Sequence, residues 1–410
     1  TLSLHDALPI FSLSITKLGV INMKKNFIGL IWGETSYNIS SILYSSVITA
    51  FLLQLGINNT QIGFMWSLVL FSQMIFDYPT GSFADKYGRL RIFTIGMIFM
   101  GIATIIIAKS YNVLMLYISG ILLGLGESQV SGTLFPWFVN SISIKNNKEK
   151  QEYIFKINAQ SQFLTNIIGV LTGFIISFFN IDYKTLLIIS GMLYIVNGVF
   201  IYFSFEDNKS TETDLVKIGK KSLLFFIKER KLWIYTLALT SSYSFYSIYL
   251  FIWQPVGKSL GITGSRLGSV YSLYLISFAI SAFISKRNIK EFVYVLCTSL
   301  IPVSLIVIYC SHNLILYLVG IVSLGFNYKM AMLKIMGTVH NFISNEVRSS
   351  VISLVSSLSS VFLIGLQIII GKILDTKNLF YLQILCIFIG IIYIICILLI
   401  QKWMHEENSR

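Results

Sequence analysis

Residues 77–91 read Asp-Tyr-Pro-Thr-Gly-Ser-Phe-Ala-Asp-Lys-Tyr-Gly-Arg-Leu-Arg and join two long apolar runs. Within this stretch, Gly81 permits the close approach of two helices, as small residues do inside membranes. Gly88 permits a turn that is too tight for a side chain. Asp85 is an anion that can cap the N-terminus of another helix. The stretch is therefore a short polar connection, and its meaning depends on the apolar runs around it.

The composition of the whole chain indicates that its surface faces lipid. Of the 410 residues, 55% are hydrophobic and 12% are charged, and the mean hydropathy is +0.75. A water-soluble domain has about 25% charged residues, so this supply cannot cover a globule in water. The apolar residues fall in long runs rather than short alternating ones, which favours membrane-spanning helices over an outer-membrane barrel.

A helix needs about 20 apolar residues to cross the hydrocarbon core of a bilayer. By this measure the sequence predicts an all-α membrane protein with twelve transmembrane helices in two six-helix bundles. The predicted spans are 27–54, 61–82, 91–109, 112–138, 156–179, 184–205, 232–257, 265–285, 291–310, 313–340, 347–373 and 379–401.

Lysine and arginine are distributed unevenly between the two sides of these spans. Cytoplasmic loops of membrane proteins collect such residues. If both termini are cytoplasmic, the opposite side receives only Lys109, Lys184, Lys258, Arg266, Lys372 and Lys377. We therefore expect a multi-pass protein of the bacterial inner (plasma) membrane with both termini in the cytoplasm. The net charge of +13 then reflects this topology and not a nucleic-acid partner.

A long charged gap divides the chain into two halves. We expect an N-terminal bundle over 23–205, a cytoplasmic linker over 206–231 and a C-terminal bundle over 232–410. Residues 1–22 contain no methionine and lack the order of regions found in a signal peptide. Met23, followed by two lysines, is typical of a bacterial start. We therefore expect residues 1–22 to be a non-native leader.

Short matches between the halves indicate an internal duplication. Leu55-Gly56-Ile57 matches Leu260-Gly261-Ile262, and each tripeptide follows the first span of its half. Gly120-Ile121 likewise matches Gly320-Ile321 in the fourth span of each half. Duplicated halves are typical of transporters that carry a central site and expose it alternately to the two sides.

The connection at 77–91 resembles the signature loop of the major facilitator superfamily, which is a Gly, then Asp-Arg/Lys-x-Gly-Arg, then a further basic residue. The residues on pattern positions, including the acid of the acid-x-Pro-Thr-Gly variant, are Asp77, Gly81, Asp85, Lys86, Gly88, Arg89 and Arg91. The resemblance implies that Asp85 caps the helix that begins near Val347-Arg348. It also implies that this contact latches the cytoplasmic gate while the transporter is open outward. The alternative is that the charges of the loop only enforce topology.

Departures from the family's drug exporters leave the substrate open. Those proteins carry an arginine in span four and a Gly-Pro motif in span five. This chain has no arginine between Leu114 and Phe138, and Gly169-Val170-Leu171-Thr172-Gly173 lacks proline. The resemblance still implies proton-coupled efflux of drugs or amphipathic metabolites as the first hypothesis. Proton-coupled uptake of a sugar, peptide or nucleoside is an alternative, and so is a transport-inactive membrane sensor or accessory protein.

Ionisable side chains deep in a span cost about 2.5 kcal/mol or more on insertion scales, so each one is a functional candidate. Glu34 lies about two turns into span one, and Glu127 lies near the middle of span four. We expect one of these two carboxyl groups to take up the driving proton. The alternative is that Glu127 is permanently paired with Lys329 of span ten.

Polar and aromatic residues of spans one, seven and ten are candidates for lining a central cavity. These candidates are Asn38, Ser41, Tyr246, Tyr249, Trp253, Asn327 and Lys329. The three aromatic residues follow helical spacing and suit an apolar or cationic ligand. Ordinary packing is the alternative for them.

Several classes of function are excluded by what the sequence lacks. No Gly-x-x-x-x-Gly-Lys-Ser/Thr phosphate loop and no hydrolase motif occurs, so we expect neither an enzyme nor ATP-driven transport by this chain alone. The four cysteines and four histidines lack metal-ligand spacing, so we expect no catalytic residue, no metal and no cofactor. The expected partners are a small-molecule substrate, protons and the lipid bilayer, with the chain acting as a monomer.

Overall fold

The computed structural model describes residues 17–142, 144, 147–208, 226–285, 289–342 and 348–408, and these residues contain helices and no strand. Within them, ten helices are long and apolar enough to cross a membrane. The other two predicted spans fall on the long helices α3 (Asn59–Tyr87) and α10 (Arg230–Ser259). Both carry glutamines, serines and threonines along their length, and neither is among the ten. The predicted all-α membrane fold is confirmed.

The N-terminal bundle comprises α3 and seven further helices. These are α1 (Lys17–Ser45), α2 (Ile48–Gln54), α4 (Arg89–Lys109), α5 (Val113–Val130), α6 (Leu134–Asn140), α7 (Asn147–Phe178) and α8 (Tyr183–Ser204). The predicted spans 27–54 and 112–138 are each broken in two, between α1 and α2 and between α5 and α6. Gly132, with a φ of 68°, turns the chain at the second break. Residues 1–16 of the expected leader lie outside the described residues, and α1 begins at Lys17.

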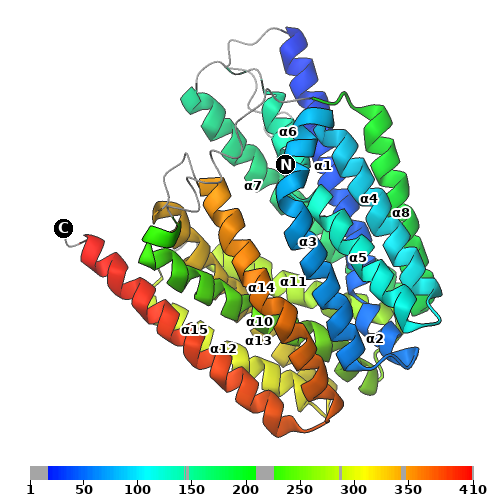
Figure 1. Ribbon diagram of the computed structural model, residues 1–410, viewed down its shortest axis with the longest axis vertical. Coiled ribbons are helices and arrows are strands. Elements are labelled where there is room, and N and C mark those ends of the chain that lie inside the picture. The colour runs from blue at the N-terminus through cyan, green and yellow to red at the C-terminus, as the bar shows by residue number, and fades with distance from the viewer. Residues whose placement is uncertain are drawn as a thin grey trace.

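The C-terminal bundle begins with α10. It continues with the 3₁₀ turn η1 (Gly264–Arg266), α11 (Leu267–Ile284), α12 (Glu291–Tyr309), α13 (Leu314–Phe342), α14 (Arg348–Asp375) and α15 (Leu379–Asn408). Most of the predicted linker 206–231 lies outside the described residues. Figure 1 shows the two bundles side by side, with their helices diverging toward the upper part of the view and α2 at the lower part.

The repeated Leu-Gly-Ile tripeptides adopt the same helix-ending conformation in both halves. Gly56 (φ 82°) and Gly261 (φ 87°) lie in the left-handed region, directly after α2 and α10. The N–H of Ile57 donates to the Leu52 carbonyl at 3.1 Å, and that of Ile262 donates to the Gly257 carbonyl at 2.9 Å. This is the hydrogen-bond pattern of a Schellman cap, which needs glycine at the left-handed position. The halves therefore share a local structure as well as a sequence.

Helices α3 and α14, which belong to different bundles, meet at one end of the molecule. A Cβ on Gly63 would collide with the backbone of Gln367, and a Cβ on Gly371 would collide with the backbone of Asn59. The Ser67 hydroxyl donates to the Ile364 carbonyl at 2.6 Å. We call this end, where α2, the start of α3 and the end of α14 lie, the closed end.

A carboxylate at the end of α14 caps the start of α3 across the bundle interface. Asp375 accepts from the backbone N–H of Asn59 and of Thr60, at 2.9 Å each. It also accepts from the Asn59 amide at 2.9 Å and the Thr60 hydroxyl at 2.6 Å. The first N–H groups of a helix have no partner within the helix, and a carboxylate there also interacts favourably with the helix dipole. Asp375 thus joins the bundles at the closed end.

Helices α7 and α11 form the second close contact between the bundles at the closed end. A Cβ on Gly173 would collide with Ser272 and the Gly268 carbonyl, and the Ser272 hydroxyl donates to the Val170 carbonyl at 2.7 Å. The Gly-x-x-x-Gly spacing of α7 therefore packs helices together, because Gly169, one turn before Gly173, lies against Asn38 of α1.

The opposite end contains the turn between α3 and α4, and we call it the open end. Gly88 adopts a φ of 112° there, and a Cβ on it would collide with the Asp207 carboxylate. Asp207 accepts from the N–H groups of Leu90 at 2.9 Å and Arg91 at 3.0 Å, and so caps α4. Both the backbone angle and the space therefore require glycine at this position.

We predict that Asp375→Asn weakens the closed end. Both carboxylate oxygens of Asp375 accept hydrogen bonds, and asparagine replaces one of them with an NH2 group that cannot accept. Loss of one net hydrogen bond costs about 1 kcal/mol, which changes a two-state population ratio about fivefold. Spin labels at positions 112 and 312, placed in a variant whose native cysteines are replaced, report the distance between the bundles at this end. The distance distribution should gain a longer component in Asp375→Asn.

The matched control is Asp182→Asn, because Asp182 caps α8 within one bundle by accepting from the Thr185 N–H at 3.0 Å. Hydrogen bonds from the Thr185 hydroxyl and then from its N–H lower the pKa of Asp182. The control should leave the distance unchanged. Equal distributions in the wild type and Asp375→Asn would show that the cap does not hold the bundles together.

Candidate functional site

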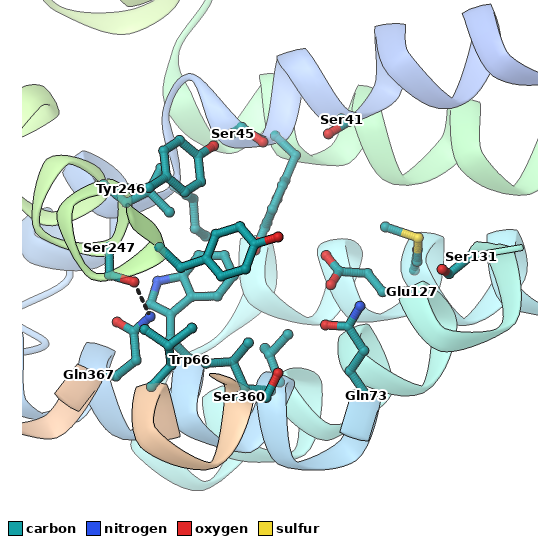
Figure 2. A pocket seen from close by; sticks show the side chains of 18 of the residues that line it. Ser41, Ser45, Trp66, Gln73, Glu127, Ser131, Tyr246, Ser247, Ser360 and Gln367 are labelled. Carbon is teal, nitrogen blue, oxygen red and sulfur yellow. Dashed lines mark hydrogen bonds between the residues drawn. The ribbon is translucent and has the colours of Figure 1, made fainter. Parts of the chain in front are cut away.

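A cavity of about 510 Å³ lies between the two bundles. Its lining comes from α1, α2, α3, α4, α5 and α8 on one side and from α10, α11 and α14 on the other. Figure 2 shows side chains from both bundles, among them Glu127, Gln73, Tyr246 and Gln367, pointing into the same space. A pocket at the interface of two domains with a few polar groups is the usual form of a small-molecule site.

The floor of the cavity, toward the closed end, is sealed by Gln254 of α10. Its side-chain amide donates to the Ser45 carbonyl at 2.7 Å and accepts from the Ala50 N–H at 2.9 Å. Ser45 ends α1 and Ala50 lies in the first turn of α2, so both groups lack partners within their helices. The fully buried glutamine thus pairs the backbone groups that the break between α1 and α2 leaves free. Nearby, the Thr49 hydroxyl donates to the Leu250 carbonyl at 3.0 Å.

Helices α3 and α14 present matching stripes to the cavity. On α3 the stripe is Trp66, Leu70, Gln73 and Asp77, and on α14 it is Ser356, Ser360, Leu363 and Gln367. Both follow the i, i+4, i+7, i+11 spacing of one helix face. The Gln367 amide donates to the Ser247 hydroxyl of α10 at 3.0 Å, which fixes its orientation.

Glu127 is held in the wall of the cavity by the small residues around it. A Cβ on Gly124 would collide with the Val69 carbonyl of α3, and a Cβ on Gly126 would crowd Met100 of α4. These contacts wedge α5 between α3 and α4 and leave the Glu127 side chain facing the cavity. No hydrogen bond to its carboxyl group is found in the described part of the chain.

Asp77 is the second carboxyl group in the cavity lining. Its Oδ1 atom is buried and has no hydrogen-bond partner among the described residues. The sequence places Asp77 in the signature loop, but the helix α3 continues through it to Tyr87. Asp77 therefore faces the cavity about three turns before the helix ends.

The polar residues predicted on span one separate into two groups. Ser41 and Ser45 line the cavity. Glu34 instead accepts a short hydrogen bond from Ser161 of α7, and Asn38 donates to the Thr165 carbonyl of α7 at 2.9 Å. Glu34 and Asn38 lie outside the lining because α7 covers this face of α1 nearer the open end.

The aromatic residues predicted on span seven also separate. Tyr246 lines the cavity, whereas Tyr249 and Trp253 are fully buried in the C-terminal bundle. Their rings stack at 5.7 Å with an angle of 13°, and Tyr249 stacks on Tyr274 at 4.7 Å. Tyr249 and Trp253 therefore serve ordinary packing, which was the alternative to lining the cavity, and they lie behind the cavity wall.

Two predicted residues of span ten also lie away from this cavity. Asn327 lines a separate, mostly apolar hollow between α11 and α13, and its amide donates to Ser323 at 3.1 Å. The Lys329 ammonium lies over the Phe278 ring, 5.5 Å from its centre. Glu127 and Lys329 form no ion pair with each other in the described structure, so the predicted static pair is absent in this state.

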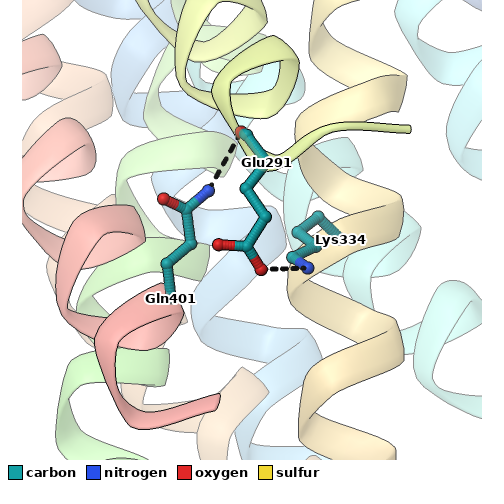
Figure 3. Close-up of polar contacts among 3 residues, drawn as sticks. All are labelled: Glu291, Lys334 and Gln401. Atoms are coloured by element: carbon teal, nitrogen blue, oxygen red, sulfur yellow. Dashed lines mark hydrogen bonds and ion pairs between the residues drawn. The ribbon is translucent and has the colours of Figure 1, made fainter. Parts of the chain in front are cut away.

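The other lysine of span ten is tied to the C-terminal bundle. Lys334 lies 3.7 Å from the Glu291 carboxylate, and the Gln401 amide donates to the Glu291 carbonyl at 3.1 Å (Figure 3). These contacts join α12, α13 and α15 near the open end. Lys334 is therefore part of the bundle's own packing.

Comparison with known proteins decides the family. The family model of the Major Facilitator Superfamily matches residues 32–362, which is most of the chain. The chain belongs to the Major Facilitator Superfamily. Members of this superfamily are membrane transporters of small molecules, and the ten long apolar helices among the described residues agree with a multi-pass membrane protein.

Two curated relatives of this facilitator are themselves uncharacterized. An MFS-type transporter of Bacillus subtilis, YxaM, is 26% identical over 239 residues, which cover 56% of this chain and 58% of that protein. A transporter of Buchnera aphidicola is 24% identical over 322 residues, which cover 74% of this chain and 78% of that protein. The chain thus matches less than two thirds of the first relative's length.

Solved structures share the fold of this facilitator at low sequence identity. A peptide transporter of the POT family in an auto-inhibited form has a TM-score of 0.69 and 10% identity, and covers 93% of this chain and 96% of its own. The nucleoside transporter NupG has a TM-score of 0.66 and 13% identity, and covers 93% of this chain and 99% of its own. A bacterial homologue of the lysosomal transporter Spinster, inward-facing and unoccupied, has a TM-score of 0.64 and 11% identity, with coverages of 93% and 98%.

The signature loop of this facilitator lies at the open end. Lys86 is exposed, and Arg91 donates from Nη2 to the Tyr202 hydroxyl at 3.4 Å. Gly81 and Asp85 lie in the last turns of α3. The sequence predicts that Asp85 caps the helix near Val347-Arg348. The Asp85 side chain and residues 343–347 lie outside the described part of the structure. That cap remains a prediction for the outward-open state.

Sequence reasoning missed several residues that line the cavity. These are Gln73, Gln254 and Gln367, the serines of α14, and Tyr44, Tyr194 and Tyr271. The glutamines and the serines of α14 are polar residues within otherwise apolar spans, so the sequence could have indicated them as cavity residues. The tyrosines do not stand out, because tyrosine is common elsewhere in this chain.

We predict that Gln254→Leu destabilises this facilitator. The substitution leaves the Ser45 carbonyl and the Ala50 N–H buried without partners, at a cost of about 1–3 kcal/mol for each group. The midpoint of thermal unfolding in detergent should fall. Gln73→Leu is the matched control, because the Gln73 amide makes no hydrogen bond in the described structure and its loss frees no backbone group. If the two variants unfold at the same temperature, Gln254 does not stabilise the break.

Proposed function

We propose that this chain is a proton-coupled secondary transporter that works by alternating access and exports drugs or amphipathic metabolites. The proposal rests on one observation: the carboxyl group of Glu127 faces a cavity that lies between the two bundles. The contacts described above between the bundles lie at the closed end. Such a cavity binds a small molecule, and rocking of the bundles exposes it to the other side.

Glu127 is the preferred proton carrier. An ionised carboxylate within a membrane is costly unless it is paired, and Glu127 lacks both a basic partner and a hydrogen bond among the described residues. Binding a proton removes that cost. Proton binding therefore shifts the balance between the inward-open and outward-open states if Glu127 is less well solvated in one of them, and such a difference is what coupling requires.

Glu34 is the second candidate for coupling. Its hydrogen bond to Ser161 joins α1 to α7 within the N-terminal bundle and lies outside the cavity. A proton on Glu34 would change the contact between two helices without contacting the substrate. We therefore assign Glu34 a smaller effect on coupling than Glu127.

The distribution of basic residues supports an orientation. The open end carries the basic residues of the α3–α4 turn and of the starts of α1, α7, α10 and α12, which are Lys86, Arg89, Arg91, Lys24, Lys25, Lys150, Lys156, Lys228, Arg230, Lys231 and Lys290. The closed end carries fewer, namely Lys109, Lys184, Lys258, Arg266, Lys372 and Lys377. Positive residues favour the cytoplasmic side. In the bacterial inner membrane, both termini would then be cytoplasmic, and the cavity would be accessible from the cytoplasm.

Uptake is the second candidate function. The hydroxyl and amide groups of the cavity suit a polar solute, and two proteins of the same fold are named as nucleoside and peptide transporters. The two directions differ in a measurable way. A deletion strain becomes more sensitive to exported compounds, whereas loss of an importer prevents growth on the imported nutrient.

We predict that Glu127→Gln uncouples transport. The amide keeps the shape of the side chain but cannot titrate, so compound-induced proton movement should fall close to that of empty vesicles. The measurement uses proteoliposomes that hold a pH-sensitive dye, an imposed pH gradient and a panel of amphipathic compounds.

The control pair for this experiment is Glu34→Gln and Glu152→Gln. Glu34→Gln should retain partial coupling, and Glu152→Gln, an exposed position on α7, should behave as wild type. Full proton movement in Glu127→Gln would contradict its role. No compound-induced proton movement in the wild type would contradict proton coupling altogether.

A further inference from the structure

The described residues that line the cavity carry acids and no base. Asp77 and Glu127 contribute carboxyl groups, and no lysine, arginine or histidine is among the lining residues. The lysines of span ten, Lys329 and Lys334, are engaged elsewhere, over Phe278 and beside Glu291. The cavity therefore presents negative charge or neutral polar groups to anything that enters it.

The two sides of the cavity differ in chemistry. Both carboxyl groups belong to the N-terminal bundle, on α3 and α5. The C-terminal bundle contributes the uncharged hydroxyl and amide groups of Ser247, Ser356, Ser360 and Gln367. A ligand that contacts both bundles thus meets acids at one side and hydrogen-bonding groups without charge at the other (Figure 2).

Aromatic side chains from both bundles also line the cavity. Trp66 and Tyr194 come from the N-terminal bundle, and Tyr246 and Tyr271 come from the C-terminal bundle. Ring faces attract cations as well as apolar groups. Anions gain nothing from ring faces and are repelled by carboxylates, and like charges placed together at a binding site strongly disfavour association.

We propose that the cavity selects organic cations that also carry hydroxyl or amide groups, with the cationic amine placed near Asp77 and Glu127. The uncharged polar groups of the ligand face the serines of α14, and its apolar part lies against the rings. This inference rests on the proposed function in one respect, namely that the substrate binds in this cavity.

The experiment measures binding to the purified full-length chain in detergent, without any gradient. The probes are puromycin, which has a primary amine, hydroxyl groups and aromatic rings, and N-acetylpuromycin, which lacks the cationic amine. Adenosine monophosphate is the anionic probe. The readouts are the shift of the thermal unfolding midpoint with probe concentration and quenching of tryptophan fluorescence.

Puromycin should bind about tenfold or more tightly than its acetylated form, because hydrogen bonds to charged groups are among the stronger ones. Adenosine monophosphate should not bind measurably. In a chain with Asp77→Asn and Glu127→Gln together, puromycin should bind no better than N-acetylpuromycin. Glu152→Gln removes one carboxylate outside the cavity and should keep the preference.

Two further variants locate the ligand. Trp66→Phe should remove most of the puromycin-dependent quenching while leaving the shift of the unfolding midpoint. Ser356→Ala with Ser360→Ala should weaken puromycin severalfold, but should leave tetraphenylphosphonium, a cation without hydroxyl or amide groups, unchanged.

The proposal is overturned if the acetylated form binds as tightly as puromycin, if adenosine monophosphate binds more tightly, or if neither puromycin nor tetraphenylphosphonium binds.

These outcomes are separate from a failure of the proposed function. Proton movement driven only by uncharged or anionic compounds would exclude this substrate class and leave transport standing. Cation binding without proton movement would exclude proton coupling and leave the substrate class standing.

Discussion

The structure depends on one constraint, which is that the hydrocarbon core offers no water to an unpaired backbone group. A continuous helix meets this constraint alone, but the broken span formed by α1 and α2 does not. Gln254 of α10 supplies the missing donor and acceptor at once, to Ser45 and Ala50. Because this residue belongs to the other bundle, the break becomes a point at which the bundles are joined. The same pair of hydrogen bonds therefore closes the floor of the cavity and adds to the contacts at the closed end.

The remaining contacts at the closed end use small residues and one charge. Glycines bring α3 against α14 and α7 against α11 closely enough for backbone atoms to meet. Without a hydrophobic driving force between helices in lipid, such packing and a few hydrogen bonds have to supply the attraction. Asp375 adds a carboxylate at the start of α3, where the helix dipole favours it. Close backbone packing and a few hydrogen bonds therefore join the two bundles at this end.

Above this junction the two bundles face each other with unlike chemistry. The N-terminal bundle carries Asp77 and Glu127, and the C-terminal bundle carries serines and a glutamine. A shared fold of duplicated halves does not require a symmetric site, because each half has its own side chains on an equivalent backbone. The matched stripes on α3 and α14 illustrate this: the spacing is the same, while the charge is confined to α3. The lining is therefore asymmetric, with both carboxyl groups on one side of the cavity.

The sequence by itself determined the membrane fold and the family. Long apolar runs have one stable form in lipid, and the pattern at 77–91 with Gly88 at its turn is specific to the superfamily. It also determined the matched caps at Gly56 and Gly261, since these depend only on local backbone angles. Only the tertiary structure decided which polar side chains face the cavity. Glu34 and Ser41 lie on one side of α1, yet α7 covers the first and leaves the second open, because helix tilt and crossing depend on packing against other helices and not on the period of a single one.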